Sequence, residues 1–450
     1  MRFCAQGAVD YLKQAGLASR GLIIGYDNRF ASEDFAAAAA EVVAGNGVTA
    51  YLCSKATPTP VVCFGVDKWK AGGAIIITAS HNPAKWNGFK FRDENGASAP
   101  TEVLAELERR VSDAYNTGEV KGLPLAKALE QGLVEYLDLT PSYLERIAEF
   151  IDLDELRKAK LKVVTDPMYG AGAGYFKKLL DGGAIEVVEI NGERNPAFPR
   201  IQPEPIAANL GKLSATVKEL KADVGIASDG DADRIGIIDE NGEFLTQLQV
   251  FALLCLYLLE TRGERGAMVK TITTTSMVDR LGEIYRIPVY EVPVGFKYVA
   301  PVMAAENAII GGEESGGYGF RGHIPERDAV PAGLYFLDLM IKTGKTPSQL
   351  LEHLYSKVGP HYYHRTDLTF PESERQKMVD QIKSNFPENI EGVRVAKVET
   401  TDGFRFILAD TTWLLIRFSG TEPVLRIYAE SDSQERVVRL LEFGRALAGA

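Results

Sequence analysis

Cysteine and histidine are scarce in this sequence, and it contains neither a long apolar run nor an excess of basic residues. The 450 residues include only four cysteines and five histidines. The cysteines form no CxxC pair, which argues against a disulfide framework or a cysteine-rich metal site and predicts reduced core residues. The few scattered histidines do not suit a phosphatase whose metal ions are held by several imidazoles.

The remaining absences narrow the choice of partners. No apolar stretch approaches the ~20 residues of a membrane span, and the first residues do not read as a signal peptide. A formal net charge of −11 argues against a nucleic-acid partner, which would require a basic face. We therefore expect a cytoplasmic protein with no membrane and no nucleic-acid partner, whose anion sites are local basic pockets.

The length and the order of the elements predict four domains. A chain of 450 residues divides into roughly three or four domains. Short apolar strands alternate with helical segments through the first three quarters, whereas alternating strands and one helix close the chain. We predict three successive α/β domains with mixed sheets and a smaller C-terminal α+β domain around a central cleft. Their ranges are 1–152, 153–258, 259–365 and 366–450.

The stretch 72–90, GGAIIITASHNPAKWNGFK, contains a buried strand followed by a polar loop. Open α/β sheets bind ligands beyond the carboxyl ends of their strands, so Ser80 lies where a ligand would bind. His81 is its neighbour in sequence, and Lys90 follows on the next strand. A serine hydroxyl close to positive charge suits phosphoryl transfer. A polar loop that only ends a strand is the alternative for this stretch alone.

Asp229, Asp231 and Asp233 alternate in an extended loop, SDGDADR, after another buried strand. Three neighbouring carboxylates repel one another unless a cation lies between them, and a hard divalent ion such as Mg²⁺ prefers oxygen ligands. An EF-hand is excluded because Arg234 occupies the position that needs glycine, although Glu240 falls at the twelfth position. A solvated acidic turn is the remaining alternative. Three ligands leave room for an oxygen of Ser80 or of a phosphate attached to it.

Two further loops have the composition of binding loops. In RFSGTEP a guanidinium, hydroxyls and a flexible backbone can converge on an anion, although an ordinary hairpin turn fits the same residues. The residues concerned are Arg417, Ser419, Gly420, Thr421 and, on the returning strand, Arg426.

In GGEESGG, Glu313 and Ser315 offer an acceptor and a hydroxyl that suit sugar hydroxyls, although a glycine-rich connection is the alternative. The glycines at 170, 172 and 174 match only part of a dinucleotide fingerprint and are interpreted as packing residues.

Together these loops resemble the α-D-phosphohexomutase superfamily, the phosphoglucomutases and phosphomannomutases. The motifs TASHNP with NGFK, DGDADR, GGEESGG and RFSGTEP occur in that order and span almost the whole chain. The resemblance implies four domains around one cleft and an enzyme that interconverts hexose 1-phosphate and hexose 6-phosphate. It also implies one Mg²⁺ per chain and a hexose 1,6-bisphosphate as primer. Sugar phosphate would be the only partner besides a second copy, since the chain would be a monomer or a homodimer.

The resemblance also implies roles for individual residues. Ser80 would carry the phosphoryl group and would complete the Mg²⁺ site of the three aspartates. His81 and Lys90 are the candidates for acid–base work, and Arg234 and Lys270 would line the cleft. Glu313 and Ser315 would contact the sugar, while Arg417, Ser419, Gly420, Thr421 and Arg426 would hold the phosphate that does not react.

Two features leave the activity and the hexose open. The family pattern begins with a strand and a G-T-[SD]-G-x-R motif, whereas this chain begins within the following helix. The first sheet would then lack one strand. A truncated sugar-phosphate-binding remnant with weak or no activity is therefore an alternative to an active enzyme. Glu314, Gly317 and the stretch 294–297 favour the glucose branch, with mannose phosphate as the alternative.

Overall fold

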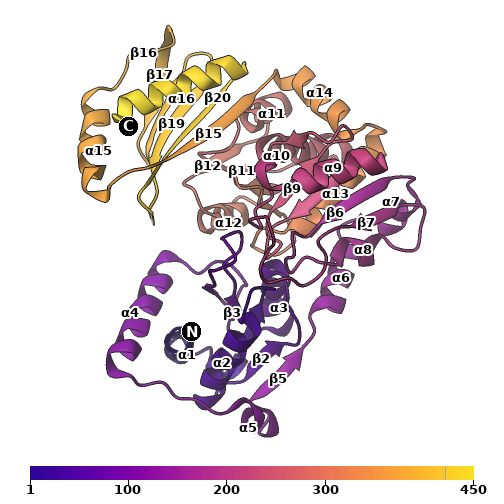
Figure 1. Ribbon diagram of the computed structural model, residues 1–450, viewed down its shortest axis with the longest axis vertical. Helices are drawn as coiled ribbons and strands as arrows, with labels where there is room; N and C mark the ends of the chain where they lie inside the picture. The colour runs from indigo at the N-terminus through magenta and orange to yellow at the C-terminus, as the bar shows by residue number, and fades with distance from the viewer. Residues whose placement is uncertain (421) are drawn as a thin grey trace.

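The computed structural model describes residues 1–420 and 422–450, and four domains follow one another along the chain (Figure 1). Three of them are α/β domains with mixed sheets, and the fourth is a smaller α+β domain, as the sequence predicts. Within the described residues, no helix has the length and apolar character needed to cross a membrane.

Domain I has the sheet order β4-β3-β1-β2-β5, in which only β4 runs antiparallel to its neighbour. Successive strand residues face opposite sides of the sheet. Ile75 and Ile77 pack with α1 and α2, while Ile76 packs with α3. The elements are α1 (Arg2–Gln14), β1 (Leu22–Tyr26), α2 (Ser32–Gly45), β2 (Ala50–Cys53), α3 (Thr59–Trp69), β3 (Ala74–Ile77), β4 (Phe89–Arg92), α4 (Thr101–Thr117), α5 (Leu125–Glu130), β5 (Val134–Leu137) and α6 (Thr140–Ala148).

Domains II and III repeat this arrangement, with sheet orders β10-β9-β8-β6-β7 and β12-β11-β13-β14. Domain II consists of α7 (Leu153–Lys158), β6 (Lys162–Asp166), α8 (Tyr175–Leu180), β7 (Glu186–Glu189), α9 (Gly211–Leu220), β8 (Val224–Ser228), β9 (Ile235–Ile238), β10 (Phe244–Leu245) and α10 (Gln247–Leu256). Domain III consists of β11 (Met268–Thr271), α11 (Met277–Tyr285), β12 (Val289–Val292), α12 (Phe296–Ala305), β13 (Ile310–Gly312), β14 (Tyr318–Phe320), α13 (Ala329–Thr343) and α14 (Pro347–Val358).

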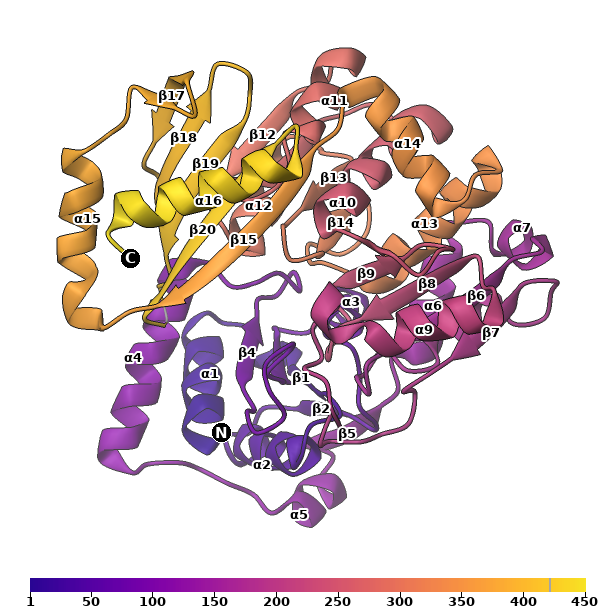
Figure 2. The same cartoon turned by 45° about the horizontal axis from the view of Figure 1, so that its top comes forward.

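Domain IV has an antiparallel sheet of order β15-β20-β19-β18-β17-β16, and α16 crosses one face of it (Figure 2). Its elements are β15 (Tyr362–Thr369), α15 (Arg375–Ser384), β16 (Asn389–Ile390), β17 (Val393–Glu399), β18 (Phe404–Leu408), β19 (Trp413–Phe418), β20 (Val424–Ser431) and α16 (Gln434–Ala448).

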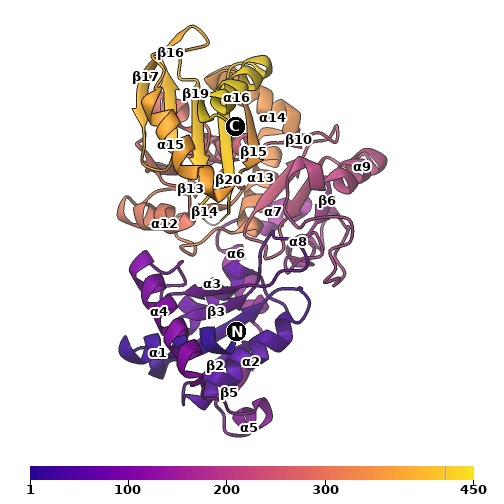
Figure 3. The same cartoon turned by 60° about the vertical axis from the view of Figure 1, so that its left-hand side comes forward.

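The buried side chains show which domains are held together. One apolar cluster runs from α3 and α6 of domain I through domain II to α10 and α13. Domain IV has its own core and meets domain III in a small cluster of Ile272, Trp413, Leu415 and Tyr428. Figure 3 shows domain I at one end of the molecule and domain IV at the other. Domains I to III therefore share a core, whereas the apolar contact between domains III and IV is small.

Two segments have a structure that their composition does not make evident. Residues 142–158 divide between α6 and α7, because the Asp152 side chain accepts the Glu155 N–H at 3.0 Å and begins a new helix. The C-terminal sheet includes residues before 366, because β15 begins at Tyr362 and pairs with β20 along its whole length. β15 is an edge strand of polar composition with little apolar alternation, so its sequence does not indicate a strand clearly.

The functional loops share one position in the three α/β domains. Each loop connects a parallel strand to the antiparallel strand beside it, between β3 and β4, between β8 and β9, and between β13 and β14. All three loops thus begin at the carboxyl end of a strand, which is where open α/β sheets usually bind ligands. The three strands belong to domains that share a core.

Candidate functional site

Ser80 is held in a strained backbone conformation beside the aspartate loop of domain II. Its φ angle is 51°, a left-handed value that costs a residue other than glycine about 1–3 kcal/mol. Its N–H donates to the Thr78 hydroxyl at 2.8 Å, and its own Oγ donates to Asp229 Oδ2 at 2.9 Å. The hydroxyl of domain I and the first aspartate of domain II therefore form one site.

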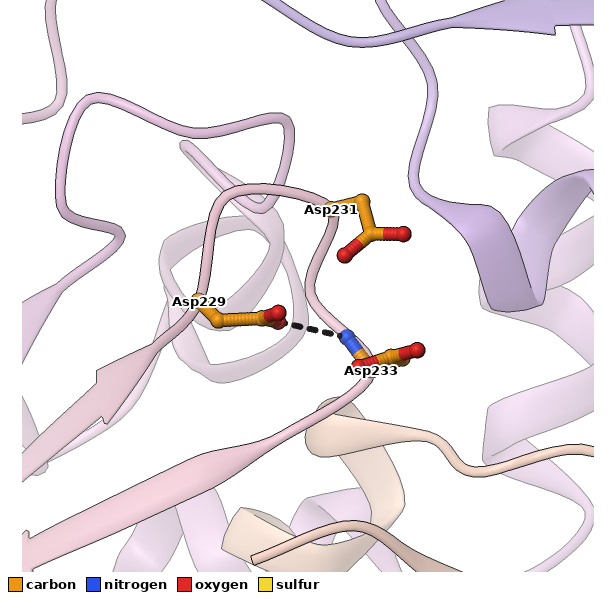
Figure 4. A group of neighbouring side chains, drawn as sticks. All are labelled: Asp229, Asp231 and Asp233. Atoms are coloured by element: carbon orange, nitrogen blue, oxygen red, sulfur yellow. Dashed lines mark hydrogen bonds between the residues drawn. The ribbon is translucent and has the colours of Figure 1, made fainter. Parts of the chain in front are cut away.

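The three aspartates are completely buried in the turn between β8 and β9. Figure 4 shows the Asp229 carboxylate directed across the turn toward the backbone of Asp233, whose N–H donates to it at 2.9 Å. One carboxylate oxygen from each aspartate lies within 4.8 Å of those of the other two. The Oδ1 atoms of Asp231 and Asp233 are buried without a hydrogen-bond partner among the described residues. Three buried carboxylates that lie this close together, two of them with an oxygen unpaired in the described part of the chain, fit a hard divalent cation.

The surroundings shift the pKa values of the three aspartates in different directions. Burial and the neighbouring carboxylates raise the pKa of Asp229. Burial also raises the pKa of Asp233, against the effect of Arg327. The pKa of Asp231 is lowered, because Lys90 and the Thr59 hydroxyl outweigh its burial. The pocket therefore concentrates negative charge that a cation would stabilise.

Two cationic side chains contact these carboxylates. Lys90 Nζ lies 2.7 Å from Asp231 Oδ2 and 3.8 Å from Asp233 Oδ2. Burial lowers the pKa of Lys90, but the two aspartates outweigh it and the net shift is upward, so the amine is charged. Arg327 lies 2.5 Å from Asp233 and 2.8 Å from Glu313, and thus joins the aspartate loop to the glycine-lined loop of domain III.

His81 and Arg234 stand next to the serine and the aspartates. His81 Nδ1 is 3.4 Å from Ser80 Oγ. Burial and the positive charge of Arg234 lower the pKa of His81 to about 2, so the imidazole is neutral at physiological pH. The Arg234 guanidinium is 3.7 Å from carboxylates of both Asp233 and Glu204.

The glycine-lined loop of domain III brings polar groups toward the same region. Glu313 is buried and pairs with Arg327, while the buried Ser315 Oγ has no hydrogen-bond partner among the described residues. A Cβ atom at Gly317 would lie 2.2 Å from Arg327 Cδ. Arg327 can therefore occupy this space because Gly317 has no side chain.

In domain IV, the loop between β19 and β20 carries the residues expected to bind a phosphate. Arg417 Nε donates to Asp402 Oδ1 at 2.9 Å, and Arg426 lies 3.6 Å from Glu422 and 3.7 Å from Asp367. Ser419 is buried, its N–H donates to the Val424 carbonyl at 2.9 Å, and a side chain at Gly420 would meet only open space. Thr421 lies outside the described residues. This structure pairs both arginines with carboxylates of their own domain.

Comparison with known proteins identifies the family. Four models described as phosphoglucomutase/phosphomannomutase match the chain: alpha/beta/alpha domains I, II and III at residues 2–117, 141–242 and 247–358, and the C-terminal domain at 371–445. The chain belongs to the phosphoglucomutase/phosphomannomutase family of the α-D-phosphohexomutase superfamily. It is therefore a mutase, an isomerase that moves a phosphoryl group within a sugar phosphate.

Individual relatives cover nearly the whole chain but carry different names. A phosphoglucomutase/phosphomannomutase of Thermococcus kodakarensis is 32% identical over 433 residues, which are 96% of this chain and 91% of that one. A probable phosphoglucosamine mutase of Pyrococcus abyssi is 33% identical over 94% of this chain and 88% of its own length. The crystal structure of a putative phosphomannomutase from Thermus thermophilus has a TM-score of 0.86 and 33% identity, with coverage of 100% of this chain and 94% of that chain.

Lys270, which the family resemblance placed along the cleft, lies apart from the serine and the aspartates. It is buried on β11, and its ammonium pairs with Asp279 and, at 3.3 Å, with Glu291. Glu291 also binds Arg405 of domain IV. The lysine thus belongs to an ion-pair network where domains III and IV meet.

Sequence reasoning missed Arg327 and Asp402, two charged residues of this phosphohexomutase. Arg327 lies in a polar connection between β14 and α13 that has no distinctive motif. The sequence shows only that Arg327 directly precedes Asp328, whose side chain caps α13. Asp402 lies in a short turn 15 residues before its partner Arg417, and it also accepts the N–H of Val294 in domain III at 3.1 Å. Neither contact follows from local spacing.

The glycine-rich segment at 170–174 packs against the aspartate loop. A Cβ atom at Gly170 would lie 2.7 Å from the Gly230 carbonyl oxygen, and one at Gly172 would lie 2.8 Å from Ser228 Oγ. The Ala171 N–H donates to the Gly230 carbonyl at 3.0 Å. The contacts agree with its interpretation as packing, because these glycines allow two backbones to approach closely.

Proposed function

We propose that this mutase interconverts hexose 1-phosphate and hexose 6-phosphate through a phosphorylated Ser80 and a hexose 1,6-bisphosphate, with glucose as the hexose. The observation that supports it is the 2.9 Å hydrogen bond between Ser80 Oγ and Asp229 within a buried carboxylate cluster. A hydroxyl so placed can hold a phosphoryl group whose oxygens complete the coordination of a cation bound by the aspartates.

The reaction consists of two transfers in opposite directions. In the first, a sugar hydroxyl gives up its proton and bonds to phosphorus, while the bond between Ser80 Oγ and phosphorus breaks and Ser80 Oγ gains a proton. In the second, the bisphosphate has turned end for end, Ser80 Oγ gives up its proton and takes the other phosphoryl group, and the freed sugar oxygen gains a proton. Each half leaves the number of phosphoryl groups and protons unchanged.

We assign the proton transfer to His81 and charge neutralisation to Lys90. His81 is neutral and 3.4 Å from Ser80 Oγ, whereas Lys90 is held in its charged form by Asp231 and Asp233. The phosphate dianion on Ser80 would raise the pKa of His81, because a nearby negative charge favours the imidazolium. Arg234 and Lys90 would then offset negative charge on the phosphoryl oxygens.

The cofactor in this proposal is one Mg²⁺ held by Asp229, Asp231, Asp233 and the Ser80 oxygen or its phosphate. Bound there, it would offset charge on the phosphoryl oxygens during transfer. Glu313 and Ser315 would bind sugar hydroxyls. Lys270 would line the cleft in this proposal, and its ammonium is paired with two carboxylates.

Domain IV would hold the phosphate that does not react. Arg417, Ser419, Gly420, Thr421 and Arg426 form this grip in the proposal. Arg417 would exchange Asp402 for a phosphate oxygen, and its planar guanidinium suits two parallel hydrogen bonds to that group. The small size of the apolar contact between domains III and IV supports closure of this loop over the substrate.

A coupled assay tests the reaction and the hexose together. Protein, MgCl₂ and a trace of glucose 1,6-bisphosphate are mixed with glucose 1-phosphate, and glucose 6-phosphate is measured with its dehydrogenase. Mannose 1-phosphate and glucosamine 1-phosphate are compared with their own bisphosphates, because relatives carry all three names. We expect the highest kcat/KM with glucose and no turnover by Ser80→Ala. Turnover by Ser80→Ala would contradict the phosphoserine, and a preference for another hexose would correct the substrate.

A further inference from the structure

Arg29 is buried directly beneath the Ser80 loop. It follows β1, its side chain has no exposed surface, and all five of its N–H groups are engaged. Nε donates to Asp27, while the four terminal N–H groups donate to backbone carbonyls of the loop. Those carbonyls belong to Ser80 and Asn82, each at 2.6 Å, to Pro83 at 2.9 Å and to Trp86 at 3.0 Å.

We propose that Arg29 is the positioning residue of the phosphoryl-transfer serine. Its rigid guanidinium gathers four carbonyls of the loop and so holds Ser80 in the left-handed conformation that directs Oγ toward Asp229. Arg29 makes no hydrogen bond to Oγ itself, so it acts through the backbone and does not take part in the chemistry. The inference rests on the proposed role of Ser80.

The surroundings of Arg29 explain why its position is well defined. Asp27 accepts from the Arg29 N–H and from the hydroxyls of Ser32 and Thr78, and Thr78 accepts the N–H of Ser80. On the other side, the Phe198 ring of domain II lies 5.1 Å from the guanidinium carbon. The arginine is therefore fixed by domain I and covered by domain II.

The neighbouring residue ties the same segment to the support of the aspartate loop. Asn28 Nδ2 donates to the carbonyls of Tyr169 and Gly170, each at 2.9 Å, and Gly170 packs on Gly230. Arg29 thus holds the serine loop, and the adjacent Asn28 holds the neighbour of the aspartate loop. A buried guanidinium is costly unless all its donors are satisfied, which agrees with a positioning role.

The test uses Arg29→Lys, which keeps the charge beside Asp27 but loses the planar fork. The rate of Ser80 phosphorylation by glucose 1,6-bisphosphate is followed by quenched intact-mass measurement. We expect a decrease of about 100-fold, the effect of a displacement near 1 Å at a reacting group. We expect kcat to fall while KM changes little, because the groups proposed to bind the substrate remain. Arg157→Lys is the matched control, since Arg157 holds the Leu179 carbonyl at 3.0 Å on the outer side of domain II.

Hydrogen–deuterium exchange separates positioning from general destabilisation. We expect faster exchange confined to residues 79–88 in Arg29→Lys, with domains II and III unchanged. The double variant Asp27→Asn/Arg29→Met removes both charges of the buried pair and provides the same comparison if the lysine variant does not fold. A folded variant that phosphorylates Ser80 at the wild-type rate, with unchanged exchange in the loop, overturns the inference. Failure of the wild type to become phosphorylated refutes the proposed function instead, and the exchange comparison still decides whether Arg29 holds the loop.

Discussion

The hydroxyl of Tyr363 donates to Glu314 Oε1 at 2.8 Å, and this bond joins the first strand of domain IV to the glycine-lined loop of domain III. Arg365 donates to the same oxygen at 3.2 Å. Glu314 stands between Glu313 and Ser315, the two residues proposed to bind the sugar. Domain IV is therefore connected to the glycine-lined loop of domain III through the Glu314 side chain, which reaches β15.

Removal of the Tyr363 hydroxyl should weaken the binding of substrate more than its conversion. Tyr363→Phe keeps the partly buried ring and loses a hydrogen bond to a charged group, worth about 1.5–3 kcal/mol. We expect KM for the hexose phosphate to rise by about tenfold, since 1.4 kcal/mol corresponds to that factor, with kcat less affected. Steady-state kinetics measure both, with Tyr136→Phe on the exposed face of β5 as the control. An unchanged KM would show that the bond does not couple the two domains.

Loss of one aspartate should abolish stabilisation by magnesium. Asp231→Asn removes a proposed ligand and the partner of Lys90, and even residues that only support metal ligands change affinity by about 10–100-fold. We expect the wild-type Tm to rise with MgCl₂ and to fall with EDTA, because a ligand of the folded state stabilises it. The variant should show little response, whereas the exposed Asp154→Asn should behave as the wild type. A full magnesium response in Asp231→Asn would contradict the site.

The buried carboxyl of Asp166 should make the stability of the fold depend on pH. Burial raises its pKa from 3.8 to about 6, against hydrogen bonds from Asn191. Between these values the folded state binds more protons than the unfolded state, so the free energy of unfolding decreases as the pH rises and levels off above pH 6. The decrease amounts to about 3 kcal/mol.

Asp166→Asn removes this titration. We expect the variant to gain stability relative to the wild type from pH 4 to pH 6 and to keep a constant difference above, as measured by urea unfolding. A difference that does not change across this range would mean that Asp166 titrates equally in both states.

Gly317 and Arg327 should behave as one unit. A methyl group at position 317 would meet the Arg327 side chain at 2.2 Å and displace it from Asp233 and Glu313. We expect Gly317→Ala and Arg327→Ala each to lower kcat/KM. Because the two residues are in contact, the double variant should lose little more than Arg327→Ala alone, which a double-mutant cycle measures. Additive losses would show that the two positions act independently.

The sequence predicted the arrangement of domains because buried strands, glycines and helix patterns are local signals. The same holds for the two sites that consist of short motifs, since Ser80 and the aspartates each follow a fully buried strand. The contact between Ser80 and Asp229 was inferred only from the rule that such strand ends face one cleft. The pairing of Tyr363 with Glu314 and the burial of Lys270 depend on how domains III and IV meet, and no local pattern contains that information.

Arg29 illustrates a second limit. Its neighbours Asp27 and Asn28 give the stretch the composition of an ordinary polar turn after β1. Its proposed role depends on hydrogen bonds to four backbone carbonyls between residues 80 and 86. A sequence does not show which backbone carbonyls a side chain contacts.

Gly230 brings the serine loop and the aspartate loop into direct main-chain contact, because a Cβ atom there would lie 2.4 Å from the Ser80 carbonyl oxygen. The separation between the Ser80 backbone and the aspartate loop is thus set by the direct contact of two polypeptide backbones, which cannot rotate out of the way as side chains do. A single added methyl group at position 230 would act as a wedge between two domains. The spacing between Ser80 and the aspartates is a property of how domains I and II pack together, and it can be lost while every charged residue remains in place.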